Sequence, residues 1–524
     1  MTPPRSTSAR PSRAPRRPFR ALAAGLAAVG LLLAGCTLPG ASQPSASDGA
    51  GDAAATPAPA GLESYYAQKV TWEDCNGGFV CATVQAPLDY EKPDGERIKL
   101  ALIRERDAVQ GRQSLVINPG GPGGSGVSYL RNGGAYSFGE DVRNEYAVVG
   151  FDPRGVGEST AVKCLSGKEN DQRRAAASIP ADEAQVGELL QDSSAYAKAC
   201  EANSPAGLLG QLGTKNAARD LDIIRNALGD AKLNYLGYSY GTKLGATFAE
   251  LFPATVGRLV LDGAMDPSLD ADAVGGAQAE AFERALDLFL QDCVDGGGCP
   301  FAGTASEARA AMTQWVHGLE ASPLDLQDGR VFTAFDAVQA ILLALYEPRN
   351  APRVTQGLTS AIQDGDATDL MALADLSSDR AEDGSYSNTN DAFTAINCQD
   401  YSHGDGNAAS ILARGKEFEK KAPFFGRYMG YDDACSQWPA AQTEAPAAIK
   451  GSADLAPIVI VGTTGDPATP YAWSEALSKQ LPNSRVLTWE GEGHTAYGRS
   501  NQCVASAVDA FLVKGTLPES GARC

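Results

Sequence analysis

Histidine is scarce in this chain of 524 residues, which has only His317, His403 and His494. These three residues are far apart, and no two cysteines have the C-x-x-C spacing typical of zinc sites and thiol redox centres. The two absences argue against a metal site, and we expect no cofactor. No apolar run after residue 33 is long enough to cross a membrane. The bulk of the chain is therefore expected to lie outside the bilayer.

Acidic residues are absent from residues 1–35, where six arginines precede the apolar run 21–33. This order is typical of an export signal. The run ends in Leu-Ala-Gly-Cys36, which resembles the lipobox of bacterial lipoproteins. The resemblance implies cleavage before Cys36 and transfer to its sulfur of a diacylglyceryl group, whose acyl chains include palmitate. It also implies a membrane-anchored protein facing outward, or shed into the medium. A plain secretory signal is the alternative, and Arg16-Arg17 leaves both general and twin-arginine export open.

Basic residues are also in deficit, with 44 Lys and Arg against 64 Asp and Glu and a net charge of −20. Removal of the six arginines in residues 1–35 leaves −26. Such a surface repels nucleic acid, so we expect no nucleic-acid partner. It is compatible with a site that attracts a cationic group, such as the free amino terminus of a peptide. The oligomeric state stays open.

Eleven cysteines become ten once Cys36 is assigned to lipid. An even count in an exported chain indicates five disulfides. Closeness in sequence favours these pairs: Cys75 with Cys81, Cys164 with Cys200, Cys293 with Cys299, Cys398 with Cys435, and Cys503 with Cys524.

Strand-like and helix-like patterns alternate in the first half of the chain, which is typical of a largely parallel sheet. The expected strands are 114–118, 145–152, 233–237, 258–262, 457–462 and 485–490. The expected helices include 214–228, with Thr214 as its N-cap, and 504–512. The predicted domains are a signal (1–35), a flexible tether (36–62), an α/β core in two parts (63–266 and 434–524), and a mainly helical cap inserted between them (267–433).

Ser239 lies in Gly237-Tyr238-Ser239-Tyr240-Gly241, between an expected strand and an expected helix. A G-x-S-x-G motif in that context is typical of a nucleophile elbow, where a strained turn lifts the serine above the sheet. We therefore predict Ser239 as the nucleophile. The backbone N–H of Tyr240 is then expected to stabilise the oxyanion.

A serine nucleophile usually needs a histidine as general base. His494 lies in a glycine-rich loop directly after the last expected strand, where this fold places its catalytic histidine, whereas His317 and His403 fall in the cap. Asp466 follows the strand before it and is the predicted acid. Asp262, at the end of an earlier strand, is the alternative.

The turn 118–126 is rich in glycine and follows the strand 114–118. Gly120 or Gly121 is expected to supply the second oxyanion N–H. Gly121, Gly123 and Gly126 also match the G-x-G-x-x-G fingerprint of dinucleotide-binding proteins, with Asp152 as the ribose carboxylate. That alternative is weaker, because the strand is not the first of the core and Ser239 and His494 would have no role.

Together, four segments resemble the secreted bacterial tripeptidyl aminopeptidases, which are α/β-hydrolase serine peptidases related to prolyl aminopeptidases. They are Gly-Gly-Pro-Gly at 120–123, FDPRGVGES at 151–159, the elbow at 237–241, and GDPATP with GEGHTAYG in the last core segment. The likeness extends from about residue 70 to 524. Pro119 stands where prolyl aminopeptidases have histidine, so their specificity does not carry over.

The resemblance implies release of short peptides, tripeptides among them, from free N-termini. Such an exopeptidase needs carboxylates or amides that hold the substrate ammonium, and Gln399 and Asp400 in the cap are the candidates. A carboxylesterase or lipase with the same triad is the alternative function, because the choice of leaving group lies in the cap. A tethered binding protein without activity is the third hypothesis.

Overall fold

The computed structural model describes residues 58–108, 111–402, 404–431 and 433–524. The export signal, the lipid site at Cys36 and most of the tether therefore lie outside the described residues, as does His403. Among the residues described, no helix is long and apolar enough to cross a membrane.

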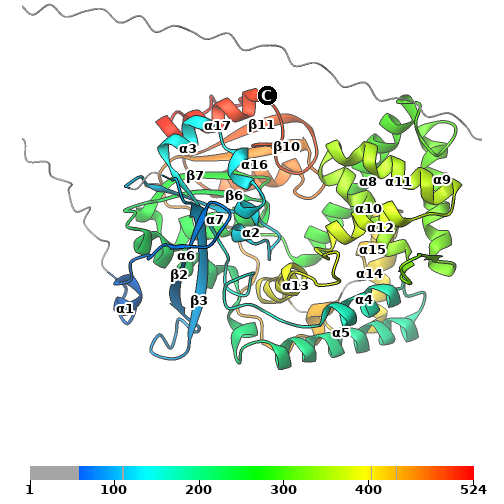
Figure 1. The fold of residues 1–524 in the computed structure, drawn as a ribbon, viewed down its shortest axis with the longest axis horizontal. Coiled ribbons are helices and arrows are strands. Elements are labelled where there is room, and N and C mark those ends of the chain that lie inside the picture. The colour runs from blue at the N-terminus through cyan, green and yellow to red at the C-terminus, as the bar shows by residue number, and fades with distance from the viewer. Residues whose placement is uncertain (1–57, 109–110, 403, 432) are drawn as a thin grey trace, which may run out of the picture. The chain divides into compact units, whose positions relative to one another are not determined.

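A nine-stranded sheet forms the centre of the core (Figure 1). Its order is β1-β2-β3-β5-β4-β6-β7-β10-β11, and the strands from β5 to β11 in that order are parallel. The strands are β1 (Glu73–Asp74), β2 (Phe79–Pro87), β3 (Arg97–Glu105), β4 (Ser114–Asn118), β5 (Ala147–Phe151), β6 (Leu233–Tyr238), β7 (Val256–Asp262), β10 (Ile458–Gly465) and β11 (Ser484–Glu492). Every residue of β4, β5 and β6 is buried, as expected for parallel strands covered on both faces.

Helices cover both faces of this sheet. One apolar cluster joins the sheet to α2 (Gly126–Arg131), α3 (Glu140–Glu145) and α17 (Gln502–Lys514). The cluster on the other face includes residues of α6 (Thr214–Leu228), α7 (Tyr240–Leu251) and α16 (Tyr471–Gln480). The architecture is that of an α/β hydrolase. The N-cap expected at Thr214 is wrong by one residue: Gly213 is the N-cap, and Thr214 begins the helix with its N–H and hydroxyl bound to Asp400.

A helical layer lies between β7 and β10 in the sequence and has its own apolar cluster, which includes Phe282, Ile341 and Phe425. Its elements are α8 (Ala271–Asp295), α9 (Ala305–Ala321), β8 (Leu324–Asp325), β9 (Val331–Phe332), α10 (Ala334–Tyr346), α11 (Ala351–Gln363), α12 (Thr368–Ser377), α13 (Thr389–Asp400), α14 (Ala408–Lys421) and α15 (Phe425–Met429). This helix content agrees with the expected cap, whose limits at 267 and 433 stay a prediction.

Two helices that precede α6 join this layer (Figure 1). They are α4 (Gly167–Ala176) and α5 (Glu183–Asn203). Val186 of α5 packs with Ile411 of α14, and Arg174 of α4 makes ion pairs with Asp336 and Asp375. The helical layer is thus built from two excursions of the chain, and the sequence indicated only the second.

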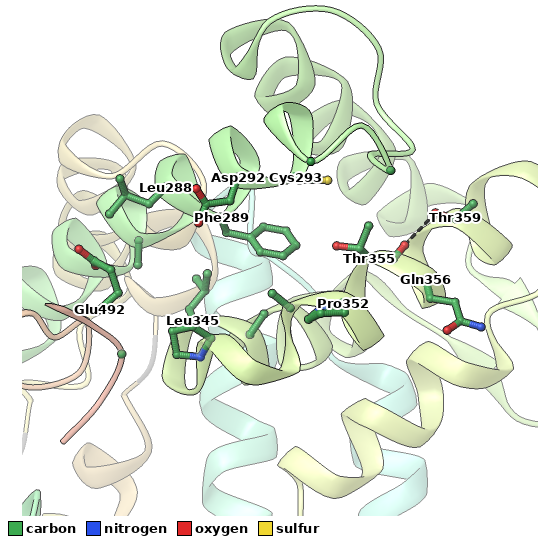
Figure 2. Close-up of a pocket in the computed structure, with 17 residues that line it drawn as sticks. Leu288, Phe289, Asp292, Cys293, Leu345, Pro352, Thr355, Gln356, Thr359 and Glu492 are labelled. Atoms are coloured by element: carbon green, nitrogen blue, oxygen red, sulfur yellow. Dashed lines mark hydrogen bonds between the residues drawn. The ribbon is translucent and has the colours of Figure 1, made fainter. Parts of the chain in front are cut away.

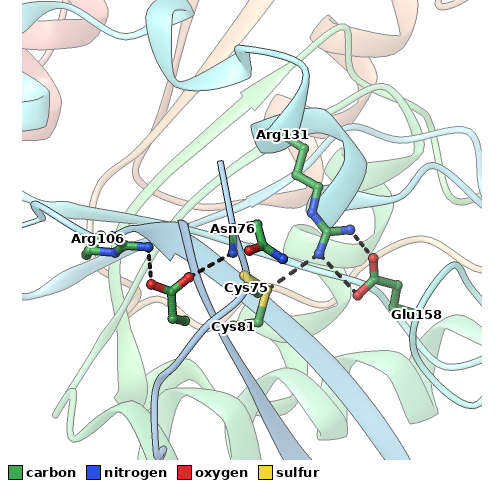
Figure 3. The surroundings of a disulfide bond; sticks show 7 residues. Cys75, Asn76, Cys81, Arg106, Arg131 and Glu158 are labelled. Atoms are coloured by element: carbon green, nitrogen blue, oxygen red, sulfur yellow. Dashed lines mark hydrogen bonds and ion pairs between the residues drawn. A yellow bond between two sulfur atoms is a disulfide. The ribbon is translucent and has the colours of Figure 1, made fainter. Parts of the chain in front are cut away.

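All five predicted disulfides are present. Cys75–Cys81 links β1 to β2 at one edge of the sheet, where Arg131 donates a hydrogen bond to Cys81 Sγ and pairs with Glu158 (Figure 3). Five disulfides are typical of a protein that matures in an oxidising compartment.

Candidate active site

Ser239 lies between the end of β6 and the start of α7, in a strained backbone conformation. Its φ of 55° and ψ of −123° are rare for a residue with a side chain. The flanking glycines are required by contact: a Cβ on Gly237 would lie 2.3 Å from the carbonyl oxygen of Gly241, and one on Gly241 would lie 2.9 Å from that of Asn118. This geometry is the strained strand–turn–helix expected of a nucleophile elbow.

His494 and Asp466 form a buried pair beyond the ends of β11 and β10. Nδ1 of His494 lies 2.9 Å and 3.0 Å from the two carboxylate oxygens of Asp466, and only 3% of Asp466 is exposed. The backbone N–H groups of Ala468, Thr469 and Thr495 donate to the same carboxylate. Because a carboxylate only accepts, Nδ1 is the donor in this pair and carries a proton.

Thr469 is a member of this site that the sequence did not single out. Its hydroxyl donates to Asp466 Oδ2 at 2.9 Å and lies 3.3 Å from His494 Nδ1. The available signal was its spacing, since a threonine three residues after an aspartate at the start of a turn often bonds its carboxylate.

Asp262, the alternative acid, occupies a different place. Its carboxylate accepts the backbone N–H groups of Ala496 and Tyr497, two and three residues beyond His494. Its backbone carbonyl accepts the N–H of Ser239 at 2.9 Å. The sequence left a choice between Asp466 and Asp262, and only Asp466 contacts the imidazole in the structure.

The glycine-rich turn after β4 lies against the elbow. A Cβ on Gly120 would lie 2.5 Å from the carbonyl oxygen of Tyr238 and 2.9 Å from Cβ of Ser239. The N–H of Gly120 already donates to Asn118 Oδ1 at 2.9 Å. Of the two predicted donors in this turn, Gly120 is therefore already engaged, and Gly121 stays the predicted oxyanion donor. The amide of Tyr240 opens α7, where helix N–H groups have no partner within the helix.

Asp152, considered above as a ribose ligand, is fully buried. Its carboxylate accepts the hydroxyl of Ser125 at 2.6 Å and the N–H groups of Val127 and Glu158. It ties the glycine-rich turn to the loop that follows β5, and its two oxygens already accept these three donors. The dinucleotide hypothesis loses its acidic ligand in this way.

The helical layer contacts both sides of the site. The carbonyl of Tyr346, at the end of α10, accepts the N–H of His494, and the two rings meet edge to face with centroids 5.4 Å apart. On the other side, a Cβ on Gly123 would lie 2.4 Å from the carbonyl oxygen of Thr389 in α13. Tyr346 and Phe393, which lies beside Ala392 in α13, are among the few large apolar side chains left exposed.

Gln399 and Asp400, the predicted ligands of a substrate ammonium, are buried at the end of α13. Asp400 accepts hydrogen bonds from Lys243 Nζ at 3.0 Å and from the N–H and hydroxyl of Thr214. Gln399 Oε1 accepts the hydroxyl of Thr443. Both side chains are at most 1% exposed, so this geometry favours a structural role over contact with substrate.

A cavity of 590 Å³ lies between α8, α10, α11 and the loop that leads to His494 (Figure 2). Its walls are mostly apolar, with Leu288, Phe289 and Leu345 among them, and Asp292 and Glu492 also line it. Burial and the charge of Asp292 raise the pKa of Glu492. The cavity therefore combines an apolar interior with carboxylates. The sequence did not indicate it, because its lining comes from three separate segments.

No group of three or more histidine, cysteine, aspartate or glutamate side chains suited to a metal ion occurs within the described part of the chain. His317 lies on α9, where its ring packs near Tyr428. Of the two described histidines, only His494 is bound to an acid at the ends of the core strands.

Comparison with known proteins finds relatives along most of the chain. Residues 422–524 match a family model described as TAP-like protein. Serine protease Hip1 of Mycobacterium tuberculosis is 36% identical over 480 residues, which are 87% of this chain and 91% of that protein. Carboxylesterase B of the same organism is 36% identical over 492 residues, covering 91% and 92%. Tripeptidyl aminopeptidase of Streptomyces lividans is 32% identical over 507 residues, covering 91% and 89%.

Proposed function

Since this chain belongs to the TAP-like family of α/β-hydrolase serine enzymes, we propose that it is an exported exopeptidase that releases short peptides, tripeptides among them, from free N-termini. The reaction is carried by Ser239, His494 and Asp466. The observation that carries the proposal is the bond from His494 to both carboxylate oxygens of buried Asp466. The loop that carries His494 is in turn joined to the serine elbow through hydrogen bonds of Asp262.

In the first half of the reaction, Oγ of Ser239 attacks the carbonyl carbon of the scissile bond while Nε2 of His494 takes its proton. The negative oxygen is stabilised by the N–H groups of Tyr240 and Gly121. The C–N bond then breaks, and the imidazolium gives its proton to the leaving amine. Asp466 holds the imidazole in the required tautomer throughout.

In the second half, a water molecule attacks the acyl group on Ser239 and gives a proton to Nε2. The C–O bond to the serine breaks, and the imidazolium returns that proton to Oγ. The released product is the short N-terminal peptide.

The helical layer, taken as a cap, selects the substrate in this proposal. An apolar groove alone would suit an acyl chain, whereas carboxylates beside an apolar cavity suit a peptide with a free amine. The cavity beside the His494 loop has both an apolar lining and two carboxylates, Asp292 and Glu492. This combination supports peptides over fatty acyl esters.

The second candidate is a carboxylesterase with the same triad, because one relative has that name. Protein lacking residues 1–36 would be given tripeptidyl, single-residue and N-blocked anilides beside short and long acyl esters. The exopeptidase predicts fast turnover of the free tripeptidyl anilide and little of the N-blocked one. Turnover of esters alone, or equal turnover of blocked and free peptides, would contradict it.

We also propose that a lipid on Cys36 anchors the protein to the outer face of the membrane. The support is the sequence preceding Cys36, together with disulfides typical of exported proteins. Expression of wild type and Cys36→Ser with labelled palmitate tests it. Label and membrane fraction should be lost together in Cys36→Ser. An unlabelled wild type would contradict the anchor and leave the catalytic proposal standing.

A further inference from the structure

Asp262 bonds to both halves of the candidate site. It is the last residue of β7 and is fully buried. Its backbone carbonyl accepts the N–H of Ser239 at 2.9 Å. Its carboxylate accepts the N–H of Ala496 at 3.0 Å and that of Tyr497 at 2.7 Å. One residue therefore fixes the backbone of the nucleophile and that of the loop carrying His494.

The backbone beside Asp262 lies close to the imidazole. Gly263 has a φ of +67°, and a Cβ there would lie 3.3 Å from Cε1 of His494 and 2.9 Å from Cγ2 of Thr495. The N–H of Gly263 donates to the carbonyl of Val461 in β10, the strand that leads to Asp466. The end of β7 thus lies between the serine and its two partners, and a small movement of it changes the distance between them.

We propose that Asp262 is a positioning residue, which holds the His494 loop in register with Ser239 and so sets the rate of proton transfer between them. This inference rests on the proposed triad. Asp262 makes no contact with the imidazole and is not the acid of the triad. A displacement of about 1 Å between reacting groups can cost about 100-fold in rate.

A carboxylate suits this place because it only accepts hydrogen bonds, and two N–H groups point at it. Several ionisable groups surround it: Arg499 and Tyr497 on the His494 loop, Asp466 beyond β10, and Tyr238 at the end of β6. Burial raises the pKa of Asp262 to about 6. Protonation would turn one oxygen into a donor facing an N–H group, and the loop would lose part of its attachment.

Burial disfavours the ionised form of Asp262 in the folded protein. With its pKa raised above the ordinary value, the folded state binds the proton more tightly than the unfolded state, so stability falls as the pH rises towards 6 and stays reduced above it. A neutral side chain would therefore remove a burden on stability. The charge therefore costs stability, and the bonds of Asp262 to both halves of the site give it a role in the reaction.

The test compares Asp262→Asn with Asp230→Asn. Asp230 is a matched control: its pKa is also raised to about 6 by burial, and it accepts the backbone N–H of Ser114, at the start of β4. The readout is the rate of labelling of Ser239 by a fluorophosphonate. In this reaction the serine oxygen bonds to phosphorus, fluoride leaves, and His494 takes the proton.

Asp262→Asn should label at least about 10-fold more slowly, with a melting temperature no more than about 3 °C below that of wild type at pH 7.5. Asp230→Asn should label at the wild-type rate. Below pH 6 the logarithm of the wild-type rate should fall with a slope greater than 1 and more steeply than that of Asp262→Asn, because protonation of Asp262 adds a loss that the Asn variant lacks.

Three outcomes separate the possibilities. Labelling that survives in Ser239→Ala would overturn the proposed function. Loss of labelling in Ser239→Ala, with wild-type rate and slope in Asp262→Asn, would overturn the inference about Asp262 alone. If Asp262→Asn does not fold, the wild-type profile still decides, because a slope that never exceeds 1 below pH 6 contradicts the inference.

Discussion

The loops at the carboxyl ends of the core strands and the helical layer between β7 and β10 are held in place differently. In the loops, buried carboxylates of Asp152, Asp262 and Asp466 accept backbone N–H groups, and glycines allow contacts that any Cβ would block. In the helical layer, an apolar cluster and ion pairs between side chains predominate. Apolar side-chain contacts tolerate volume-conserving exchange, whereas a Cβ added at the glycines of these loops would meet backbone atoms. We therefore expect substitutions in the core loops to affect the chemistry, and substitutions in the helical layer to affect mainly the choice of substrate.

The largest effect is expected from the core loops. Ser239→Ala and His494→Ala should each lower kcat for a tripeptidyl anilide by at least about 10⁴-fold, because nucleophile and base act as a unit. The melting temperature should change little. His317→Ala, a histidine of the helical layer, is the control and should keep wild-type turnover. More than a few per cent of residual activity in Ser239→Ala would contradict the assignment of the chemistry to the core loops.

Gly120→Ala should have the next largest effect. Its methyl group would lie 2.5 Å from the carbonyl oxygen of Tyr238, so either the turn or the elbow must move. We expect kcat to fall about 100-fold, as for loss of an oxyanion donor, with a small change in KM. Gly229 shares the positive φ, but an added Cβ there would have no atom within 4 Å. Gly229→Ala should therefore lower stability and leave activity unchanged. Equal losses of activity in both variants would show that φ strain, and not contact, is responsible.

The contact between the layer and the core is expected to have an intermediate effect. Tyr346→Leu removes the ring that lies edge to face against His494, and we expect about a 10-fold loss of kcat, within the range measured for aromatic pairs. Tyr346→Phe keeps the ring and should keep kcat. Steady-state kinetics of both variants on one anilide would check this. An equally large loss of kcat in Tyr346→Phe would assign the effect to the hydroxyl of Tyr346. The helical layer would then contribute a group to the chemistry.

The sequence was most informative where residue type is dictated by backbone geometry. The strand 114–118 and the helix 214–228 were predicted with the bounds found in the structure, because buried runs and a clear apolar face mark them. The elbow and the loop of His494 were placed by their glycines and by the scarcity of histidine. The disulfides were predicted correctly from closeness in sequence alone.

Contacts made by distant segments could not be predicted in this way. The packing of α5 on α14 and the cavity lined by α8, α10 and α11 depend on the path of the chain between elements. For the same reason Asp400 was predicted to face substrate. Its partners Thr214 and Lys243 lie more than 150 residues earlier in the chain, and nothing local to Asp400 indicates them.

The smallest effect is expected at Glu444, where the core and the helical layer meet. Its carboxylate accepts the N–H of Lys215 at 2.8 Å, and burial together with the charge of Asp400 raises its pKa to about 7. A raised pKa means that the folded state holds the proton more tightly than the unfolded state, so stability falls as the pH rises from about 4.5 towards 7. Glu444→Gln keeps an acceptor for Lys215 without the charge.

Glu444→Gln should therefore match wild type in stability near pH 4.5 and exceed it by about 1 kcal/mol at pH 8. Urea unfolding at the two pH values measures the difference. Glu169→Gln is a control of opposite sign, because hydrogen bonds from Ser166 lower the pKa of Glu169, and loss of its charge should cost stability at pH 8. A Glu444→Gln variant that is less stable than wild type at pH 8 would show that Lys243 and Lys215 outweigh Asp400 here. The junction would then be held by charge pairing, as the helical layer is.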